Sequence, residues 1–313
     1  RILEALPPSE ALVGPGDDAA VIAAPDGRVV VTTDTLVHGP DFRLAWSPPR
    51  LLGRKAAAVN LADIAAMGAR PTALIVALAL PDDTPLDFVS DLAAGMVEAC
   101  ADLAPDCRVE GGDLTVSDTL TIAVTALGSL DGRPPVLRSG ARPGDRLELV
   151  GEAGVAARGL EILFERFVDA SGSPVPVDVA GMAPALSDAD AHAVAMQRAP
   201  RPPVSQGAEA AIRGATAMMD VSDGLALDAR RMAEASGVTL DIERRQLGPD
   251  PERALRGGED HALLIAMPEA AQAVGHPIGW VRERGVAAVT VDGAAYDVRG
   301  GWDPYSDWDS ARG

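Results

Sequence analysis

The stretch GPGDDAAV, residues 14–21, places two adjacent carboxylates, Asp17 and Asp18, in a glycine turn. An apolar run over residues 19–24 follows and predicts a strand. Like charges held this close repel each other, so a fold that keeps them together needs a cation or a strong hydrogen-bond donor between them. A solvated, aspartate-rich turn is the alternative, and one such pair does not decide between the two interpretations.

Acidic residues recur along the chain, mostly at predicted strand ends or glycine turns. Asp34 follows the β-branched run at 28–33, and Asp113 follows a glycine pair. A denser group surrounds Ser222 at a predicted strand-to-helix turn. The full set is Asp17, Asp18, Asp34, Asp63, Asp113, Asp220 and Asp223. Carboxylates that hold several Mg²⁺ ions around a polyphosphate would explain all of these positions together.

Two of these groups also have simpler interpretations. Asn60 and Asp63 are three residues apart on a predicted helix and therefore share a face, which could be a solvated polar stripe. Asp220, Ser222 and Asp223 could instead cap the helix that follows them. The sequence leaves both alternatives open.

Composition excludes several classes of partner and site. The chain has 313 residues and a formal charge of −19, which argues against binding to nucleic acid or to an anionic membrane. Lys55 is its only lysine, and no Gly-Lys-Ser/Thr triplet is present, so a P-loop is excluded. The protein-kinase HRD and DFG motifs are also absent.

The cysteines and the apolar segments indicate a cytoplasmic protein. Cys100 and Cys107 form no CxxC pair, and we expect free thiols. The first eleven residues include Glu4 and Glu10, which is not typical of a signal peptide. The longest apolar run, residues 73–80, is too short to span a bilayer.

The order of predicted elements fits mixed sheets covered by helices. Residues 134–145 are rich in proline and glycine and mark the best domain boundary, and residues 170–184 form a long loop. We expect strands at 19–24, 28–33, 73–80, 108–110, 120–127, 146–150, 216–219, 238–242 and 261–267, and helices at 48–67, 85–103, 155–167, 189–197, 206–213 and 225–235.

Seven motifs, in this order, resemble the thiamine-monophosphate kinase family of the aminoimidazole-ribonucleotide-synthetase-like superfamily. They are GDDAAV (16–21), TTDTLV (32–37), KAAAVNLADIAAMGARP (55–71), GGDLT (111–115), RSGARPGD (138–145), DVSDGLALD (220–228) and GGEDHALL (257–264). The resemblance covers nearly the whole chain. It implies ATP-dependent phosphorylation of thiamine monophosphate to thiamine diphosphate by direct in-line transfer.

The resemblance also implies the fold and the assembly. We expect an α/β domain over residues 1–137, which binds ATP and Mg²⁺ and whose mixed sheet joins that of a second copy in a dimer barrel. We expect an α+β domain over residues 138–313 to complete the active site. The implied partners are ATP, thiamine monophosphate and a second copy of the chain.

Site residues are implied by position within the motifs. The implied Mg²⁺ ligands are Asp17, Asp18, Thr32, Thr33, Asp34, Asp63, Asp113, Asp220 and Asp223. The implied ATP contacts are Gly112, Asp113, Arg138 and Ser222, and the implied substrate contacts are Asp41, Glu259 and Trp302. Asp220 and Arg138 are the candidate catalytic residues, with Arg138 donating to the developing charge.

Three positions depart from the family's motifs. Asp41 stands where the family often has a histidine, which leaves its contact with substrate open. The turn GEAGVAARGL at 151–160 lacks a frequent serine, which weakens an anion-binding role there. His261 replaces a frequent tyrosine.

Other interpretations are another ATP-using enzyme of the superfamily and a non-catalytic nucleotide-binding homologue. No cysteine precedes Cys100, which disfavours a selenophosphate synthetase, and the chain ends Ala-Arg-Gly, without the C-terminal cysteine of the hydrogenase-maturation enzymes.

Overall fold

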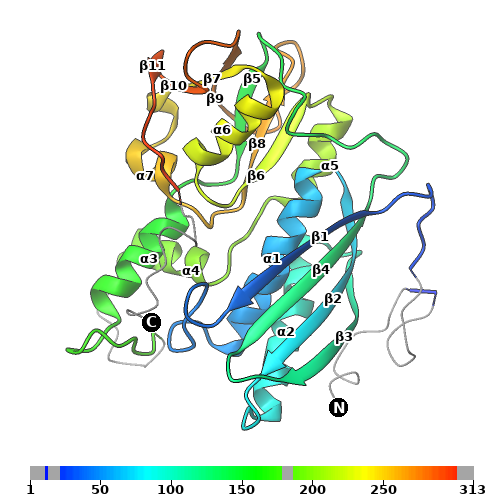
Figure 1. Cartoon of the computed structure of the whole chain (residues 1–313), viewed down its shortest axis with the longest axis vertical. Coiled ribbons are helices and arrows are strands. Elements are labelled where there is room, and N and C mark those ends of the chain that lie inside the picture. Colours follow the sequence, from blue (N-terminus) through cyan, green and yellow to red (C-terminus); the bar gives the residue numbers. More distant parts are fainter. Residues whose placement is uncertain (1–10, 13–21, 178–185, 302–313) are drawn as a thin grey trace.

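The computed structural model describes residues 11–12, 22–177 and 186–301, which form two mixed sheets with helices packed on and between them (Figure 1). The expected strand at 19–24 lies largely outside the described residues. The elements of the N-terminal half are β1 (Val30–Val37), α1 (Pro49–Ala66), β2 (Arg70–Leu80), α2 (Leu86–Leu103), β3 (Arg108–Val116) and β4 (Thr121–Ser129).

The N-terminal sheet has the strand order β1-β4-β2-β3, with β2 and β3 parallel and the other pairs antiparallel. One face packs on α1 and α2 around a core that includes Leu52, Leu61, Ile64, Leu74 and Ile122. Side chains alternate between the two faces of a strand, so every second residue of β1 points away from these helices. Val31, Thr33 and Thr35 are therefore exposed on the opposite face.

Helices α1 and α2 approach each other closely because each has a glycine at the crossing. A Cβ on Gly53 would lie 2.0 Å from the carbonyl oxygen of Leu92, and a Cβ on Gly95 would lie 1.9 Å from that of Arg50. Both contacts are with backbone atoms, which have little freedom to move aside. The two glycines therefore set the distance between the helices.

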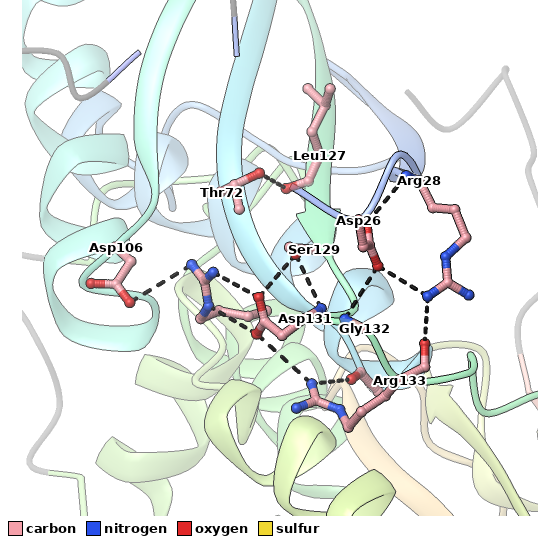
Figure 2. A network of polar contacts seen from close by, with 11 residues as sticks. Asp26, Arg28, Thr72, Asp106, Leu127, Ser129, Asp131, Gly132 and Arg133 are labelled. Carbon is pink, nitrogen blue, oxygen red and sulfur yellow. Dashed lines mark hydrogen bonds and ion pairs between the residues drawn. The ribbon is translucent and has the colours of Figure 1, made fainter. Parts of the chain in front are cut away.

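A polar network closes the end of the N-terminal sheet near the domain linker (Figure 2). Asp131 accepts hydrogen bonds from Arg70, at 2.9 Å, and from Ser129. Asp26 pairs with Arg28 and accepts the backbone N–H of residue 132 at 3.2 Å. The segment that precedes β1 is thus tied to the turn that follows β4.

The C-terminal half forms the second sheet, with the order β11-β10-β7-β9-β5-β8-β6. Its elements are β5 (Arg146–Val150), α3 (Val155–Arg166), α4 (Asp188–Arg198), α5 (Val204–Ile212), β6 (Ala217–Val221), α6 (Leu225–Ser236), β7 (Thr239–Ile242), the 3-10 helix η2 (Arg244–Gln246), α7 (Pro251–Arg256), β8 (Ala262–Met267), β9 (His276–Arg282), β10 (Val289–Val291) and β11 (Ala294–Ala295). The α/β and α+β mixture expected from the sequence is confirmed.

A shared apolar cluster joins the two halves. Ala66 at the end of α1 packs with Ala210 of α5 and with Met218, Leu263 and Ile265 of the second sheet. In Figure 1, the upper end of α1 lies beside α5. Helix α1 therefore contributes to the cores on both sides.

Three details of the sequence prediction were wrong. Asp34 lies inside β1 rather than at its end, because the strand continues to Val37. Gly111 and Gly112 lie inside β3 rather than in a turn. A Cβ on Gly112 would lie 2.1 Å from the carbonyl oxygen of Val76, so this glycine permits close pairing of β2 and β3. Asp220 likewise lies within β6.

Within the described part of the chain, no helix is both long enough and apolar enough to cross a membrane.

At the α1–α2 crossing, we predict that replacing a glycine by alanine destabilises the protein, which is opposite to the usual effect of this substitution in a helix. Replacing glycine by alanine inside a helix normally stabilises it by up to about 1 kcal/mol. We expect Gly95→Ala instead to lower the free energy of unfolding by about 2–3 kcal/mol, because the new methyl group meets backbone. Urea denaturation measures this difference. Gly111→Ala is the control, since its Cβ would meet only Ile75 at an ordinary 3.7 Å; equal stability of the two variants would contradict the prediction.

Candidate active site

Four carboxylates from both halves of the chain lie near one another at the junction of the two sheets. Asp34 comes from β1, Asp63 from α1, Asp220 from β6, and Asp223 from the turn after β6. Asp34 is within electrostatic range of Asp220 and Asp223, and Asp63 is within range of Asp34 and Asp220. The structure therefore brings together four of the predicted acidic positions.

Local hydrogen bonds hold the first two of these acids. The Thr32 hydroxyl donates to Asp63 at 2.7 Å, and the backbone N–H of Asp34 donates to the side-chain oxygen of Asn60 at 3.0 Å. Asn60 is buried, and its amide donates to the carbonyl oxygen of Ala56 at 2.9 Å. The interpretation of Asn60 and Asp63 as a solvated stripe is therefore excluded.

Burial and repulsion from neighbouring acids raise the pKa of Asp34 and Asp63. The pKa of Asp63 rises from 3.8 to about 7, first because the carboxyl is desolvated and then because Asp220 and Asp34 repel its charge. Burial also raises the pKa of Asp34, with Asp220 and Asp223 adding to the effect. The charged forms of Asp34 and Asp63 are therefore unfavourable unless a cation lies close to them.

The turn between β6 and α6 is held by a residue that the sequence analysis did not single out. Asp228 is fully buried and accepts the backbone N–H groups of Asp223 and Gly224 at 3.1 and 3.2 Å. Gly224 is the N-cap of α6 and supplies no side-chain cap. The helix-capping alternative for Asp220, Ser222 and Asp223 is thus excluded, although Asp223 pairs with Arg231 at 2.6 Å.

The turn before β8 packs directly on the turn after β6. The N–H of Glu259 donates to the carbonyl oxygen of Ser222 at 2.6 Å, and His261 Nδ1 lies 3.3 Å from Asp220 Oδ2. Glu259 and His261 both have positive φ values, of 69° and 51°, which side-chain-bearing residues adopt rarely. Such backbone positions are concentrated at functional sites.

An ion pair links α1 to this turn. Lys55 Nζ lies 2.6 Å from Glu259 Oε2 and also donates to the backbone carbonyl of Gln197 at 3.4 Å. Burial acts to raise the pKa of Glu259, but the charge of Lys55 and its hydrogen bond hold that pKa below its usual value. Glu259 is therefore an anion at neutral pH.

A cavity of about 430 Å³ opens beside this ion pair. Its apolar wall includes Phe42, Trp46, Leu160 and Phe164, and the Arg43 guanidinium stacks on the rings of Trp46 and Phe164 at 5.4 and 5.3 Å. Its polar end contains Asp41, Lys55, Gln197 and Glu259. The cavity suits a ligand with a flat apolar body and a polar end.

Asp41 is held in this cavity wall by its own loop. Its Oδ2 accepts the backbone N–H of Val37 at 2.7 Å. Burial raises its pKa, and the charge of Glu259 adds to this effect. Asp41 and Glu259 are thus two carboxylates in the wall of one cavity.

Other predicted site residues lie elsewhere or outside the described residues. Asp17, Asp18 and Trp302 fall outside the described ranges. The Thr33 hydroxyl donates to the Val124 carbonyl on the open sheet face, away from Thr32. Arg138 is exposed in the linker.

Gly112 and Asp113 lie at the opposite edge of the N-terminal sheet from Asp34. The register places Asp34, Val124, Val76 and Gly112 in one row across the four strands. Three strand spacings separate the ends of this row, about 14 Å. One copy of the chain therefore does not bring Asp113 to the acid cluster.

The acid cluster offers the donors that a hard divalent cation prefers. Its side chains present carboxylate oxygens whose mutual repulsion a cation would relieve. Within the described ranges, however, no three His, Cys, Asp or Glu side chains are close enough to enclose a metal ion. The donor chemistry fits Mg²⁺, while the complete coordination geometry is not formed by these residues alone.

Several residues of the site were missed by the sequence analysis. Lys55 was noted only as the single lysine, His261 only as a departure from a motif, and Gln197, Trp46 and Asp228 were given no role at the site. Their functional positions depend on contacts between distant segments, which no local pattern reveals.

Comparisons with known proteins identify the family of the chain. Residues 16–130 match the family model described as AIR synthase related protein, N-terminal domain. A thiamine-monophosphate kinase of Mycobacterium tuberculosis (strain CDC 1551 / Oshkosh) is 40% identical over 318 residues, which cover 97% of this chain and 89% of that protein.

Solved structures agree in fold and in extent. A crystal structure of thiamine-monophosphate kinase from Stenotrophomonas maltophilia K279a matches with a TM-score of 0.78 and 30% identity, covering 95% of this chain and 96% of that one. AaThiL complexed with AMPPCP and TMP matches with a TM-score of 0.75 and 28% identity, covering 93% and 91%. The identity and coverage of these matches show that the chain belongs to the thiamine-monophosphate kinase family.

Proposed function

We propose that this chain transfers the terminal phosphoryl group of ATP to thiamine monophosphate, giving ADP and thiamine diphosphate. The observation that carries the proposal is the apolar cavity that opens beside a cluster of carboxylates. A substrate with two aromatic rings and a phosphate tail requires these two environments side by side. The relative that bears the name of this activity, at 40% identity, supports the same reaction.

The chemistry needs positioning more than it needs a nucleophilic side chain. An oxygen of the substrate phosphate is already anionic; it forms the new bond to the γ-phosphorus while the bond to the ADP oxygen breaks. The chain must therefore align the two phosphates and exclude water. We propose that Ser222, Gly112, Asp113 and Arg138 contact ATP, with Arg138 donating to the charge that develops during transfer.

We propose Mg²⁺ as the cofactor, held by Asp17, Asp18, Thr32, Thr33, Asp34, Asp63, Asp113, Asp220 and Asp223. Mg²⁺ would neutralise phosphate charge in a chain whose net charge is −19. The raised pKa of Asp63 supports a cation at this place, because a neighbouring positive charge would remove the repulsion that raises it. Asp220 contacts the turn before β8 through His261.

We propose that the substrate end of the site contains Asp41, Glu259 and Trp302. Lys55 pairs with Glu259, so Asp41 is the carboxylate of the cavity wall that would favour a cationic ring such as thiazolium. The aromatic wall supplies the stacking surface.

We propose a homodimer in which the partner's sheet covers the open face of the N-terminal sheet. Val31 is 60% exposed there, and a sheet with an apolar open face gains stability from cover.

We propose residues 1–137 and 138–313 as the two domains, and the cytoplasm as the location. The linker and the two sheets support the division. The free, buried thiols of Cys100 and Cys107 support a reducing compartment. The net charge supports the absence of nucleic-acid and membrane partners.

The reaction is tested by incubating the protein with ATP, Mg²⁺ and thiamine monophosphate and identifying the products by mass. We expect thiamine diphosphate and ADP. Free thiamine should be a poor acceptor, because its hydroxyl lacks the anionic oxygen that aligns with ATP. Turnover of free thiamine equal to or better than that of the monophosphate would refute the proposal.

The acid cluster is tested with Asp63→Asn. We expect the activity to fall by orders of magnitude, because a hard-cation ligand loses its charge. The native pKa of Asp63, about 7, lies above its ordinary 3.8, so its contribution to stability is full below about pH 4 and is lost as the pH rises through 7. In EDTA, the variant should therefore melt above the wild type at pH 8, with the difference closing toward pH 4.

The control for this experiment is Asp83→Asn, at an exposed position outside the cluster. It should leave the activity unchanged and shift the melting temperature equally at both pH values. Wild-type activity of Asp63→Asn at low millimolar Mg²⁺ would remove Asp63 from the ligand set.

The dimer is tested by light scattering. We expect a mass of twice the 32.2 kDa of one chain at micromolar concentration. Val31→Glu places a charge on the proposed interface and should give a folded monomer with little activity. Val286→Glu, at a fully exposed position in the C-terminal half, should remain a dimer. A monomeric wild type would overturn the proposed assembly.

A further inference from the structure

The cavity beside the acid cluster contains a hydrogen-bond acceptor with no partner. Gln197, on α4, is 8% exposed and lies at the polar end of the cavity with Lys55 and Glu259. In the part of the chain that the structure describes, only two buried side-chain nitrogen or oxygen atoms lack a hydrogen-bond partner. They are Arg133 Nε and Gln197 Oε1, and the second belongs to a residue of the cavity wall.

The neighbouring ion pair fixes the orientation of the Gln197 amide. Its Nε2 donates to Glu259 Oε2 at 2.9 Å, and Lys55 Nζ donates to the same oxygen at 2.6 Å. A carboxylate that is charged accepts hydrogen bonds and cannot donate them, so the amide must turn its NH₂ toward Glu259. The Lys55 charge keeps Glu259 in this state, which leaves Oε1 as the free end.

A buried acceptor without a donor costs free energy, so a ligand group that brings an N–H to Gln197 Oε1 gains by supplying the missing donor. The ring system of thiamine monophosphate carries one group with N–H bonds, the exocyclic amino group of its pyrimidine. Its thiazolium nitrogen is fully substituted, and the pyrimidine ring nitrogens are acceptors. Only the amino group can satisfy Gln197.

We propose that Gln197 Oε1 accepts a hydrogen bond from the exocyclic amino group of the aminopyrimidine, and that Lys55 is a positioning residue that orients Gln197 through Glu259. This inference rests on the proposed function, since it assigns a specificity role within the same site. Gln197 then selects an aminopyrimidine over an oxopyrimidine. In an oxopyrimidine, a carbonyl oxygen replaces the amino group and faces Oε1, and two acceptor oxygens cannot form a hydrogen bond with each other.

The test compares thiamine monophosphate with oxythiamine monophosphate, in which a carbonyl oxygen replaces the exocyclic amino group. For the wild-type protein we expect kcat/KM to be roughly ten- to hundredfold higher for thiamine monophosphate. Gln197→Met keeps the length of the side chain and removes the acceptor. In that variant the ratio between the two substrates should fall to within about threefold.

Gln206→Met is the matched control. Gln206 is a half-buried glutamine on α5 that does not line the cavity, so this variant should keep the wild-type ratio. A residue with a purely structural role would lower turnover of both substrates in proportion and leave their ratio unchanged. That result for Gln197→Met would overturn the proposal, as would a wild-type ratio within about twofold of one.

Calorimetric titration of the two phosphates separates this proposal from the proposed function. If the wild type binds thiamine monophosphate roughly tenfold more tightly than its oxo analogue and Gln197→Met abolishes this preference, but no phosphate is transferred, the proposed function fails and the Gln197 assignment stands. If thiamine monophosphate is phosphorylated but the two ligands bind equally, the assignment fails and the function stands. This second outcome is measured on the wild-type protein alone, so it does not depend on folding of Gln197→Met.

Discussion

Repulsion between four carboxylates is the constraint that the rest of this structure must satisfy. Asp34, Asp63 and Asp220 come from three elements and Asp223 from the turn after β6, and burial first, then repulsion from neighbouring acids, raises the pKa of Asp34 and Asp63. They stay together because helix α1 is fixed on both sides. The glycine crossing with α2 and the sheet core hold one side, and the cluster around Ala66 and Ala210 holds the other.

The sequence predicted the scaffold well where a local pattern carried the information. Helix α1 and strand β5 match the expected ranges closely, because their apolar runs end at clear proline, glycine or charged residues. Asp63 was predicted as a site residue from its position in the family motif, while its place on the helix alone also allowed a solvated stripe. Asp34 was identified, but the end of its strand was placed too early, since TLV after it continues the β pattern.

The remainder of the site depends on contacts that no window of sequence contains. Lys55 and Glu259 are 204 residues apart, and their ion pair exists because the turn at 257–261 folds back onto Ser222. The glycine pair at 111–112 predicts a turn, because glycine is common in turns. In the structure, Gly112 allows β2 and β3 to pair closely, because a Cβ at this position would clash with the carbonyl oxygen of Val76. This contact between two strands cannot be read from the local sequence.

Carboxylates occur at both ends of the site, in the acid cluster and in the cavity wall, but their electrostatic surroundings differ. In the proposed function, the acid cluster lies at the phosphate end, where carboxylates held close together with little positive charge would attract a cation. Glu259 lies at the ring end and already pairs with Lys55, so we propose that its charge orients Gln197 rather than attracting a metal ion. A carboxylate paired with a buried lysine would then act in substrate recognition, whereas the clustered carboxylates without one would bind the metal ion. Because Lys55 and Asp63 lie on the same helix, a single rigid element sets the distance between these two ends.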